Sequence, residues 1–390
     1  MQRVEMRRIV YIGYRKGVSL RCRRFDGICR FARTRGWEVI PLDPDVEKDP
    51  EHLRETLARL DPVGVIREGP RARRPLTPRF FAPIPAVCID PPAGVTWRGA
   101  AVVCDEAAVA KAAFCELSSG LPPAYAVISH WPARGTPWAR SRVKAFRALC
   151  RAEGKPCLVF PERREEDVAA RAARLAAWVA ALPLHCAVFA VSDYAVQEDI
   201  ARAFVAAGRS LPRTATLVGV DAVEVPGDSA IAADVSSVRI DFELSGFLAA
   251  KSLTEQPNRL KAPPSFGPLL VERRKSTRTR GRGRREPWIL DAVEAIRRKA
   301  CDGLTAAALI NNYPVSKRLF NLRFREAMGH SVHDEIIQVR LESVFALLAD
   351  TDTPVGAIAD MCGFGSAVEL RQVFKAKTKM SMTEWRARHR

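Results

Sequence analysis

The 390-residue sequence lacks any run of about 18 consecutive apolar residues, so it predicts no membrane-spanning helix. Its N-terminus leads directly into a strand-like stretch, without the apolar core and small-residue cleavage site of a secretory signal. None of the ten cysteines forms a Cys-x-x-Cys pair, which argues against zinc ribbons and disulfide scaffolds. We therefore expect a protein of the reducing cytoplasm with no membrane partner.

Signatures of the common catalytic sites are also missing. The chain contains no GxGxxG, GxxxxGK[ST] or GxSxG segment. Its six histidines are scattered. His330 and His333 are close in sequence, but no cysteine or carboxylate spacing completes a metal site beside them. The sequence therefore predicts neither an enzyme nor a metalloprotein, and it implies no cofactor.

Positive charge, in contrast, is in excess. The 62 Lys and Arg residues outnumber the 44 Asp and Glu residues, giving a formal charge of +18. Segment 273–286 has 8 basic residues and 1 acidic residue, against 39 and 31 in residues 1–272 and 15 and 12 in residues 287–390. Such a basic segment adds sequence-independent attraction to nucleic-acid phosphates. For residues 1–272, arginine richness that reflects genome composition is an alternative explanation.

The chain is too long for one core and divides into three parts. Residues 1–272 alternate short apolar runs with amphipathic segments. This alternation predicts an α/β domain of parallel sheets in two doubly wound lobes. Residues 273–286 contain no apolar side chain and predict a flexible basic linker. Residues 287–390 predict an all-α domain, including one helix over 288–299 and a long one over 331–349.

Two segments of the helical part share one layout. Residues 304–329 and 355–381 each predict a short helix, a tight turn and a longer helix that begins at a serine. Those serines, Ser316 and Ser366, suit the N-cap position. Apolar residues four apart define the buried face of each longer helix: Phe320 with Phe324, and Leu370 with Phe374. This layout is typical of a helix-turn-helix, whose second helix enters the DNA major groove.

The opposite faces of the two longer helices carry the residues that we expect to contact DNA. Lys317, Arg325 and Lys375 suit phosphates, whereas the other arginines suit guanine and the amide side chains suit adenine. The apolar members suit thymine methyl groups. The predicted set is Ser316, Lys317, Arg318, Asn321, Leu322, Arg325, Ser366, Ala367, Val368, Arg371, Gln372 and Lys375. For any one of them, an ordinary solvated position is the alternative.

Residues 287–390 resemble the AraC/XylS-type DNA-binding domain of bacterial transcription regulators. The resemblance is carried by Arg323-Phe-Arg-Glu-Ala-Met-Gly329, Ile358-Ala-Asp-Met-Cys-Gly-Phe-Gly-Ser366 and Met380-Ser-Met-Thr-Glu-Trp-Arg386. It implies two helix-turn-helix units that occupy adjacent segments of the major groove. The family's usual glycine in the first turn is Pro314 here, and its usual alanine in the preceding helix is Ile310.

Residues 1–272 also offer candidate ligand groups. Asp193 and Asp221 each follow an apolar strand-like run, and Arg142 lies on an amphipathic segment. Ligands of doubly wound sheets bind beyond the carboxyl ends of the strands. One arginine and two carboxylates can hold several hydroxyl groups in fixed directions. We therefore predict a ligand site of Arg142, Asp193 and Asp221, with helix capping as the alternative role of the two aspartates.

Residues 7–270 resemble the LacI-type, periplasmic-binding-protein-like (type I) sensor domain, and the resemblance implies sugar contacts by Arg142 and Asp221. Ser192 replaces that family's usual asparagine. The joining of such a sensor to an AraC-type domain resembles the XylR-type xylose regulators. It implies a cytoplasmic regulator that binds double-stranded operator or promoter DNA as a homodimer under control of a sugar such as xylose, with RNA polymerase as a further candidate partner.

Two other functions fit the same sequence. The sensor domain could bind a small ligand that is not a sugar. Alternatively, the protein could bind DNA constitutively and use residues 1–272 only for dimerisation.

Overall fold

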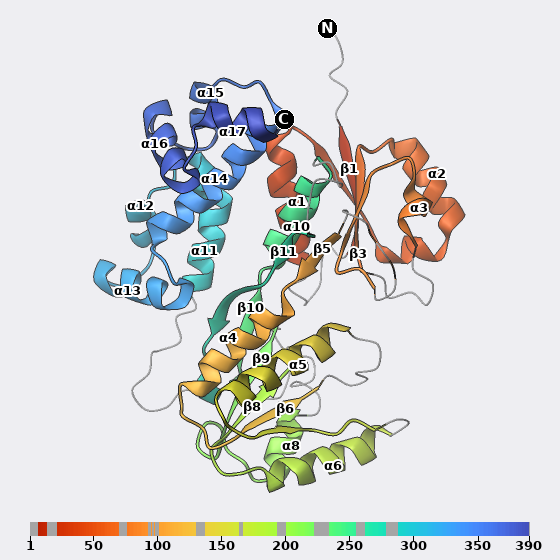
Figure 1. Ribbon diagram of the computed structural model, residues 1–390, viewed down its shortest axis with the longest axis vertical. Coiled ribbons are helices and arrows are strands. Elements are labelled where there is room, and N and C mark those ends of the chain that lie inside the picture. The colour runs from red at the N-terminus through yellow and green to blue at the C-terminus, as the bar shows by residue number, and fades with distance from the viewer. Residues whose placement is uncertain are drawn as a thin grey trace.

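The computed structural model describes residues 7–13, 22–69, 76–92, 95, 97, 101–129, 137–163, 167–192, 200–221, 234–254, 262–277 and 288–389. They form an upper sheet lobe, a lower sheet lobe and a helical domain beside the upper lobe (Figure 1). This arrangement confirms the predicted two-lobed α/β region followed by an all-α region. No helix among the described residues is long and apolar enough to cross a membrane.

The upper lobe is a six-stranded parallel sheet in the order β11-β5-β4-β3-β1-β2. In β1, Ile9 and Tyr11 belong to one core, whereas Val10 and Ile12 belong to another. Both faces of this strand are covered, so all four of these side chains are apolar or aromatic. Its elements are β1 (Arg8–Ile12), α1 (Arg23–Thr34), β2 (Glu38–Leu42), the 3-10 helix Pro44–Lys48, α2 (Pro50–Leu60), β3 (Gly64–Glu68), α3 (Pro78–Phe81), β4 (Ala86–Ile89), β5 (Ala101–Cys104), α10 (Phe242–Ser252) and β11 (Ser265–Phe266).

The lower lobe repeats this plan with the order β12-β10-β9-β8-β6-β7, in which only β12 is antiparallel to its neighbour. Strand β8 is again apolar on both faces, and all five of its residues are buried. Its elements are α4 (Glu106–Ser118), β6 (Tyr125–Ile128), α5 (Pro137–Ala152), β7 (Cys157–Val159), α6 (Val168–Ala181), β8 (Cys186–Ala190), α8 (Ala201–Ala206), β9 (Ala215–Val220), β10 (Ser236–Ile240) and β12 (Pro268–Glu272).

The chain crosses between the lobes three times, and the crossings lie side by side. It leaves β5 for α4 at Asp105, leaves β10 for α10 at Asp241, and leaves β11 for β12 at Gly267. The Asp105 amide donates to the carbonyl of Phe266 at 2.7 Å, and the Asp241 amide donates to that of Gly267 at 2.9 Å. We call these three crossings the hinge.

Helices α1 and α10 of the upper lobe pack with their backbones almost in contact. A Cβ atom on Gly27 would lie 1.8 Å from the carbonyl oxygen of Glu243, and one on Gly246 would lie 1.9 Å from that of Arg24. No side chain larger than hydrogen fits at either position. The two glycines therefore fix where α1 and α10 cross, and with it the positions of the charged residues beside them.

The helical domain has two cores that share α14. One core contains Phe320 and Phe324, and the other contains Leu370 and Phe374. The predicted helices over 288–299 and 331–349 are observed as α11 and α14. The elements are α11 (Trp288–Lys299), the 3-10 helix Ala300–Asp302, α12 (Ala306–Ile310), α13 (Lys317–Met328), α14 (Val332–Asp350), α15 (Val355–Met361), α16 (Ala367–Thr378) and α17 (Met382–His389).

The folded sheet region extends beyond residue 272 into the segment expected to be a linker. Arg274 is buried, and Ser276 is buried with its hydroxyl donating to the carbonyl of Leu217 at 2.5 Å. A 3-10 helix, Lys275–Thr277, ends this part. Residues 278–287, which include the rest of the expected linker, lie outside the described residues.

Candidate DNA-binding face and ligand cleft

Both predicted helix-turn-helix units have the expected local structure. Ser316 caps α13 by accepting from the amide of Leu319 at 3.3 Å, and Ser366 caps α16 by accepting from that of Glu369 at 3.1 Å. The predicted inner-face residues, Phe320, Phe324, Leu370 and Phe374, are all fully buried. The buried faces of α13 and α16, which were predicted from residue spacing, are therefore confirmed.

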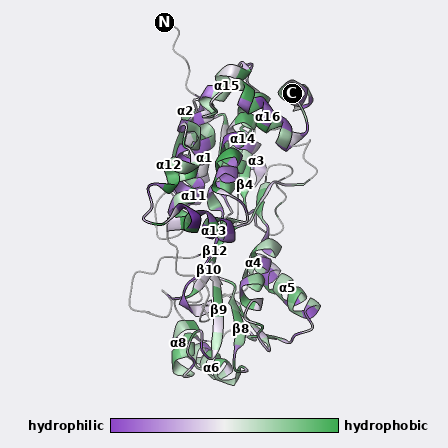
Figure 2. Cartoon of the chain, turned by 90° about the vertical axis from the view of Figure 1, so that its left-hand side faces the viewer, coloured by the Kyte–Doolittle hydropathy of each residue, from purple (hydrophilic) through white to green (hydrophobic). Residues whose placement is uncertain are grey.

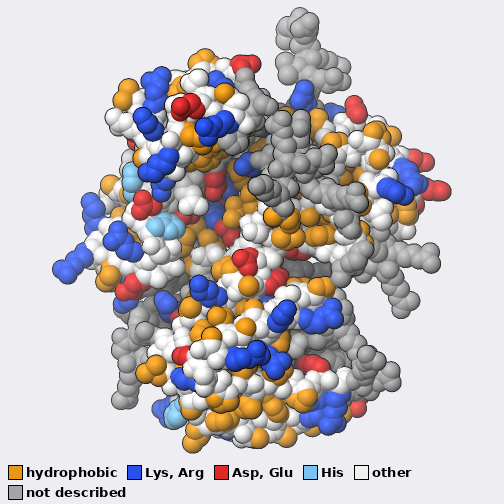
Figure 3. All heavy atoms as spheres, in the orientation of Figure 1, with side chains coloured by type: hydrophobic (Ala, Val, Ile, Leu, Met, Phe, Trp, Pro, Cys, Tyr) orange, Lys and Arg blue, Asp and Glu red, His pale blue; other side chains and the backbone are white. Residues whose placement is uncertain are grey.

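The outer faces of α13 and α16 are accessible. All the predicted DNA-contacting residues are exposed except Ala367, which is half-buried against the second core. Leu322 and Val368 are 53% and 58% exposed, although they are apolar. The two helices lie at opposite ends of α14 on the left side of Figure 1, and Figure 2 looks onto that side. Lys and Arg side chains are displayed over this region in Figure 3.

In the turn of the second helix-turn-helix unit, between α15 and α16, position 363 requires a glycine for two separate reasons. Gly363 has a φ of 75°, and a Cβ there would lie 2.7 Å from the carbonyl oxygens of both Ala300 and Cys301. The turn between α15 and α16 is thus packed against the 3-10 helix Ala300–Asp302 that follows α11. Glu369 then accepts from the Gly365 amide at 2.8 Å, which ties the turn to the first turn of α16.

The two lobes present matching aspartates beyond equivalent strands. Asp90 follows β4 and Asp221 follows β9, and each of these strands is third in its sheet order. Both residues have a positive φ, 52° and 86°, which is uncommon outside glycine and is found often at functional sites. Ligands of such sheets bind at these strand ends, so we place the candidate ligand cleft beside these two aspartates.

Arg142 is held rigidly on the lower side of this cleft. Its Nε donates to Glu106 at 2.6 Å, and its Nη1 donates to the carbonyl of Val191 at 2.7 Å. The guanidinium also lies over the ring of Trp138, 4.7 Å from the ring centroid. Asp221 adds an electrostatic attraction without a direct bond. Arg142 and Asp221 are therefore close enough to attract each other, and their contact with a ligand stays a prediction.

Glu106 links this cluster to the hinge. It is the first residue of α4, directly after the crossing at Asp105. Burial raises the pKa of the Glu106 carboxyl above its ordinary value, although the charge of Arg142 opposes the shift. Burial and the neighbouring Glu106 likewise raise the pKa of the Cys104 thiol. The hinge side of the cleft is therefore poorly solvated, which strengthens hydrogen bonds made there.

The upper side of the cleft has its own arginine. Arg24 of α1 is buried and forms ion pairs with Glu68 at 3.0 Å and with Asp90 at 2.7 Å. The hydroxyl of Tyr11 bonds to Glu68 at 2.5 Å. Asp90 is the most open member, with its side chain 38% exposed. In the upper lobe a buried arginine therefore orients Asp90, whereas in the lower lobe the buried Arg142 orients Glu106 and not Asp221.

The sequence-based prediction was incomplete for this cleft. Asp193 lies outside the described residues, so its place in the cleft stays a prediction. Asp90, Glu106 and Arg24 were not predicted. Asp90 had a signal, because Val87-Cys-Ile-Asp90 repeats the pattern of Val218-Gly-Val-Asp221. Within the part of the chain that the structure describes, no three His, Cys, Asp or Glu residues are grouped to hold a metal ion.

Comparison with known proteins assigns a domain family to each region. A helix-turn-helix domain family matches residues 309–388, and a periplasmic binding protein-like domain family matches residues 123–277. The xylose operon regulatory protein of Escherichia coli strain K12 is 28% identical over 294 residues, 73% of each chain. That of Haemophilus influenzae strain KW20 is 27% identical over 216 residues, 55% of each chain.

Solved structures agree in fold. The structure of xylose-binding transcription activator xylR covers 98% of both chains at 22% identity, with a TM-score of 0.51. A transcriptional regulator CelR–cellobiose complex covers 70% of this chain and 85% of the other at 20% identity, with a TM-score of 0.52.

These findings confirm an AraC-type helix-turn-helix domain joined to a periplasmic-binding-protein-like sensor domain. The chain is homologous to the xylose operon regulators and has the domain composition of a ligand-controlled transcription regulator of the XylR type. Its relatives are transcription regulators and not enzymes, in agreement with the sequence-based expectation.

Replacing Arg142 should cost stability as well as any ligand contact. Arg142→Ala leaves the half-buried Glu106 without its partner, and we expect it to lower the free energy of unfolding by about 3–5 kcal/mol. Urea unfolding of the double variant Arg142→Ala/Glu106→Gln should show a smaller loss than the sum of the two single losses.

Arg147→Ala is the matched control, because Arg147 lies on the exposed face of the same helix. It should change stability by less than about 0.5 kcal/mol. Equal losses for Arg142→Ala and Arg147→Ala would show that the Arg142–Glu106 pair has no structural role.

Proposed function

We propose that this protein regulates transcription in the bacterial cytoplasm by binding operator DNA through α13 and α16, under control of a small polyhydroxylated ligand held between the two lobes. D-xylose is the first candidate ligand, and RNA polymerase is a further candidate partner. The observation that carries the proposal is the joining of two exposed, N-capped recognition helices to two lobes that each carry an aspartate of positive φ directly after a strand.

The chemistry of the cleft supports a ligand with several hydroxyl groups. Carboxylates accept hydrogen bonds from hydroxyls, and guanidinium groups donate to them. Asp221 Oδ1 is buried and has no hydrogen-bond partner among the described residues, so a hydroxyl donor would satisfy it. The names of the relatives, xylose operon regulatory proteins, favour xylose over other sugars as the first ligand to test.

The ligand assignment is tested best at Asp221, which anchors no ion pair within the described residues. D-xylose at 100 times its dissociation constant should stabilise the wild-type protein by about 2.7 kcal/mol, measured as a rise in melting temperature. Asp221→Ala should remove most of that rise, because the buried hydrogen bond to a hydroxyl is lost.

Glu55→Ala provides the control, since Glu55 is exposed on α2 and lies outside the cleft. It should respond to D-xylose like the wild type. If the wild-type protein responds instead to another pentose, a hexose or a sugar acid, that compound replaces xylose as the proposed ligand. No response to any polyhydroxylated compound would contradict the sensor assignment.

Two substitutions in α16 should distinguish a base-specific DNA contact from a phosphate contact. Gln372→Ala should weaken binding to a selected operator by about 1–3 kcal/mol and relax preference at one base pair, because an amide pairs with adenine. Lys375→Ala should weaken binding to operator and random duplexes alike and reduce the salt dependence. Fluorescence anisotropy at several salt concentrations measures both. Equal losses of Gln372→Ala on operator and random DNA would remove Gln372 from the base-contacting set.

We further propose that the active form is a homodimer on two half-sites. Residues 287–390 carry a net charge of only +3 (15 basic and 12 acidic residues), so two copies held together would add contacts and effective concentration. Closed two-fold dimers are the commonest oligomers. Inserting about half a helical turn between the half-sites should reduce binding, and inserting a full turn should restore part of it. A monomer by light scattering, with no effect of spacing, would contradict this model of assembly.

A further inference from the structure

The helical domain is attached to the hinge itself. Asp241 is the hinge residue at which the chain leaves β10 of the lower lobe and enters α10 of the upper lobe. Its amide donates to Gly267 of the neighbouring crossing at 2.9 Å, and its Oδ1 accepts from the Leu244 amide at 2.9 Å, which caps α10. The orientation of this one residue therefore depends on two hinge crossings and on the start of α10.

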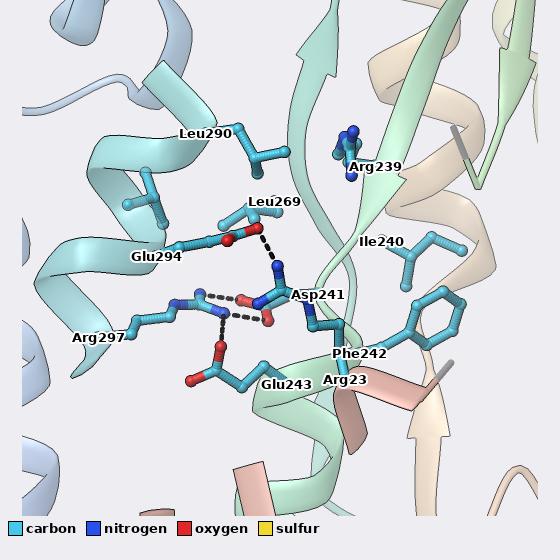
Figure 4. A pocket seen from close by; sticks show the side chains of 11 residues that line it. Arg23, Arg239, Ile240, Asp241, Phe242, Glu243, Leu269, Leu290, Glu294 and Arg297 are labelled. Carbon is cyan, nitrogen blue, oxygen red and sulfur yellow. Dashed lines mark hydrogen bonds and ion pairs between the residues drawn. The ribbon is translucent and has the colours of Figure 1, made fainter. Parts of the chain in front are cut away.

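Arg297 of α11 holds the same carboxylate from the helical domain. Its Nη1 donates to Asp241 Oδ1 at 2.7 Å and its Nη2 donates to Oδ2 at 2.5 Å, in a bidentate pair (Figure 4). The two side chains are 10% and 9% exposed. A planar fork of this kind transmits orientation as well as charge, since both bonds must remain aligned.

The electrostatic environment keeps the pair ionised. Burial disfavours the carboxylate, but the charge and hydrogen bonds of Arg297 outweigh it and hold the pKa of Asp241 below its ordinary value. Burial likewise opposes the charge of Arg297, and its acidic neighbours Asp241, Glu243 and Glu335 raise its pKa. Glu243 lies 3.6 Å from Arg297 as the second of these neighbours. Removal of either partner would leave a buried charge without its counterion.

A second, apolar attachment meets the hinge beside the first. The chain leaves the crossing at Gly267 into β12, where Leu270 is buried and Leu269 is partly buried. Both leucines pack into the core around Phe320 and Phe324 of α13. The segments that follow two of the three crossings, α10 and β12, are thus each bound to the first half of the helical domain.

Besides the pairs of Arg297 with Asp241 and Glu243, the ion pairs between the sensor and the helical domain among the described residues start on α1. Arg23 pairs with Glu294 of α11, and Arg30 pairs with Glu342 of α14 at 2.7 Å. Helix α1 lies wholly within the upper lobe and moves with it. These pairs therefore attach the helical domain to one lobe, whereas the Arg297–Asp241 pair attaches it to the residue that changes direction between lobes.

We propose that the Arg297–Asp241 pair is the contact through which a change in the angle between the lobes reorients α11 and the recognition helix α13. When the lobes rotate about the hinge, the carboxylate of Asp241 turns with the backbone and the guanidinium follows it. Arg297 is thus a positioning residue and touches neither ligand nor DNA. The coupling is reciprocal, so a fixed helical domain also restrains the hinge.

The reciprocal effect can be measured without a ligand, by hydrogen exchange in the full-length protein. Arg297→Met should make the hinge amides of Asp105 and Asp241 exchange at least tenfold faster, because the helical domain no longer restrains them. Arg297→Lys, which keeps the charge but not the fork, should give an intermediate rate. Glu342→Gln is the matched control. It breaks the Arg30–Glu342 bridge between the same two bodies but leaves the Arg297–Asp241 fork and the Arg30–Glu243 pair in place, so it should leave the hinge amides within about twofold of wild type.

A second variant tests the same contact if Arg297→Met fails to fold. Asp241→Asn keeps the oxygen that caps α10 and removes the charge that Arg297 binds, so it should also accelerate exchange at the Asp105 amide. Amides of α14 report whether the helical domain is still folded. Unchanged hinge exchange in folded Arg297→Met or Asp241→Asn, or equal acceleration by Glu342→Gln, would overturn the proposal.

The consequence for regulation rests on the proposed function and is tested separately. With D-xylose as the probe, the ratio of operator dissociation constants with and without sugar should approach one in Arg297→Met, whereas Glu342→Gln should keep the wild-type ratio. A wild-type protein that does not respond to D-xylose would contradict the proposed ligand. The exchange measurements would still decide whether the pair couples hinge and helices.

Discussion

A charge that leaves water must find a partner, and this constraint shapes much of the molecule. Seven arginines are buried among the described residues, and six of them form ion pairs with carboxylates. The seventh, Arg340, donates to two backbone carbonyls at the end of α11 and in the segment after it. Five of these buried arginines lie within residues 1–272, so part of the arginine content of that region is structural.

The fold was predictable wherever apolar residues recurred at helical or strand spacing over the whole length of an element. Helices α11 and α14 and most strands were predicted, because their apolar residues recur at helical or strand spacing. The four-residue strand β5 and helix α10 were not predicted. Helix α10 buries residues all around its axis, so it has no polar face to reveal its period. The packing of the helical domain on the upper lobe was also beyond prediction, since it depends on pairs such as Arg30–Glu342, which are distant in sequence.

The two candidate sites differed in how much the sequence revealed. The recognition helices are local features, so their caps, buried faces and exposed faces follow from spacing within about a dozen residues. The cleft is assembled from strand ends far apart in the chain. Asp221 was predicted from its place after a strand-like run and Arg142 from its amphipathic segment, and the family resemblance implied the same two residues. Glu106 and Arg24 carry no local signal that distinguishes them from solvated charges. Only the matching strand ends at Asp90 and Asp221 would have suggested the upper aspartate.

The two helix-turn-helix units are not equally independent. The core around Leu370 and Phe374 uses only residues of the helical domain, whereas the core around Phe320 and Phe324 includes Leu269 and Leu270 of the sensor strand β12. The first unit therefore does not contain all of its own interior. A helical domain separated from the sensor would therefore lose part of the interior of its first unit and keep the whole interior of its second.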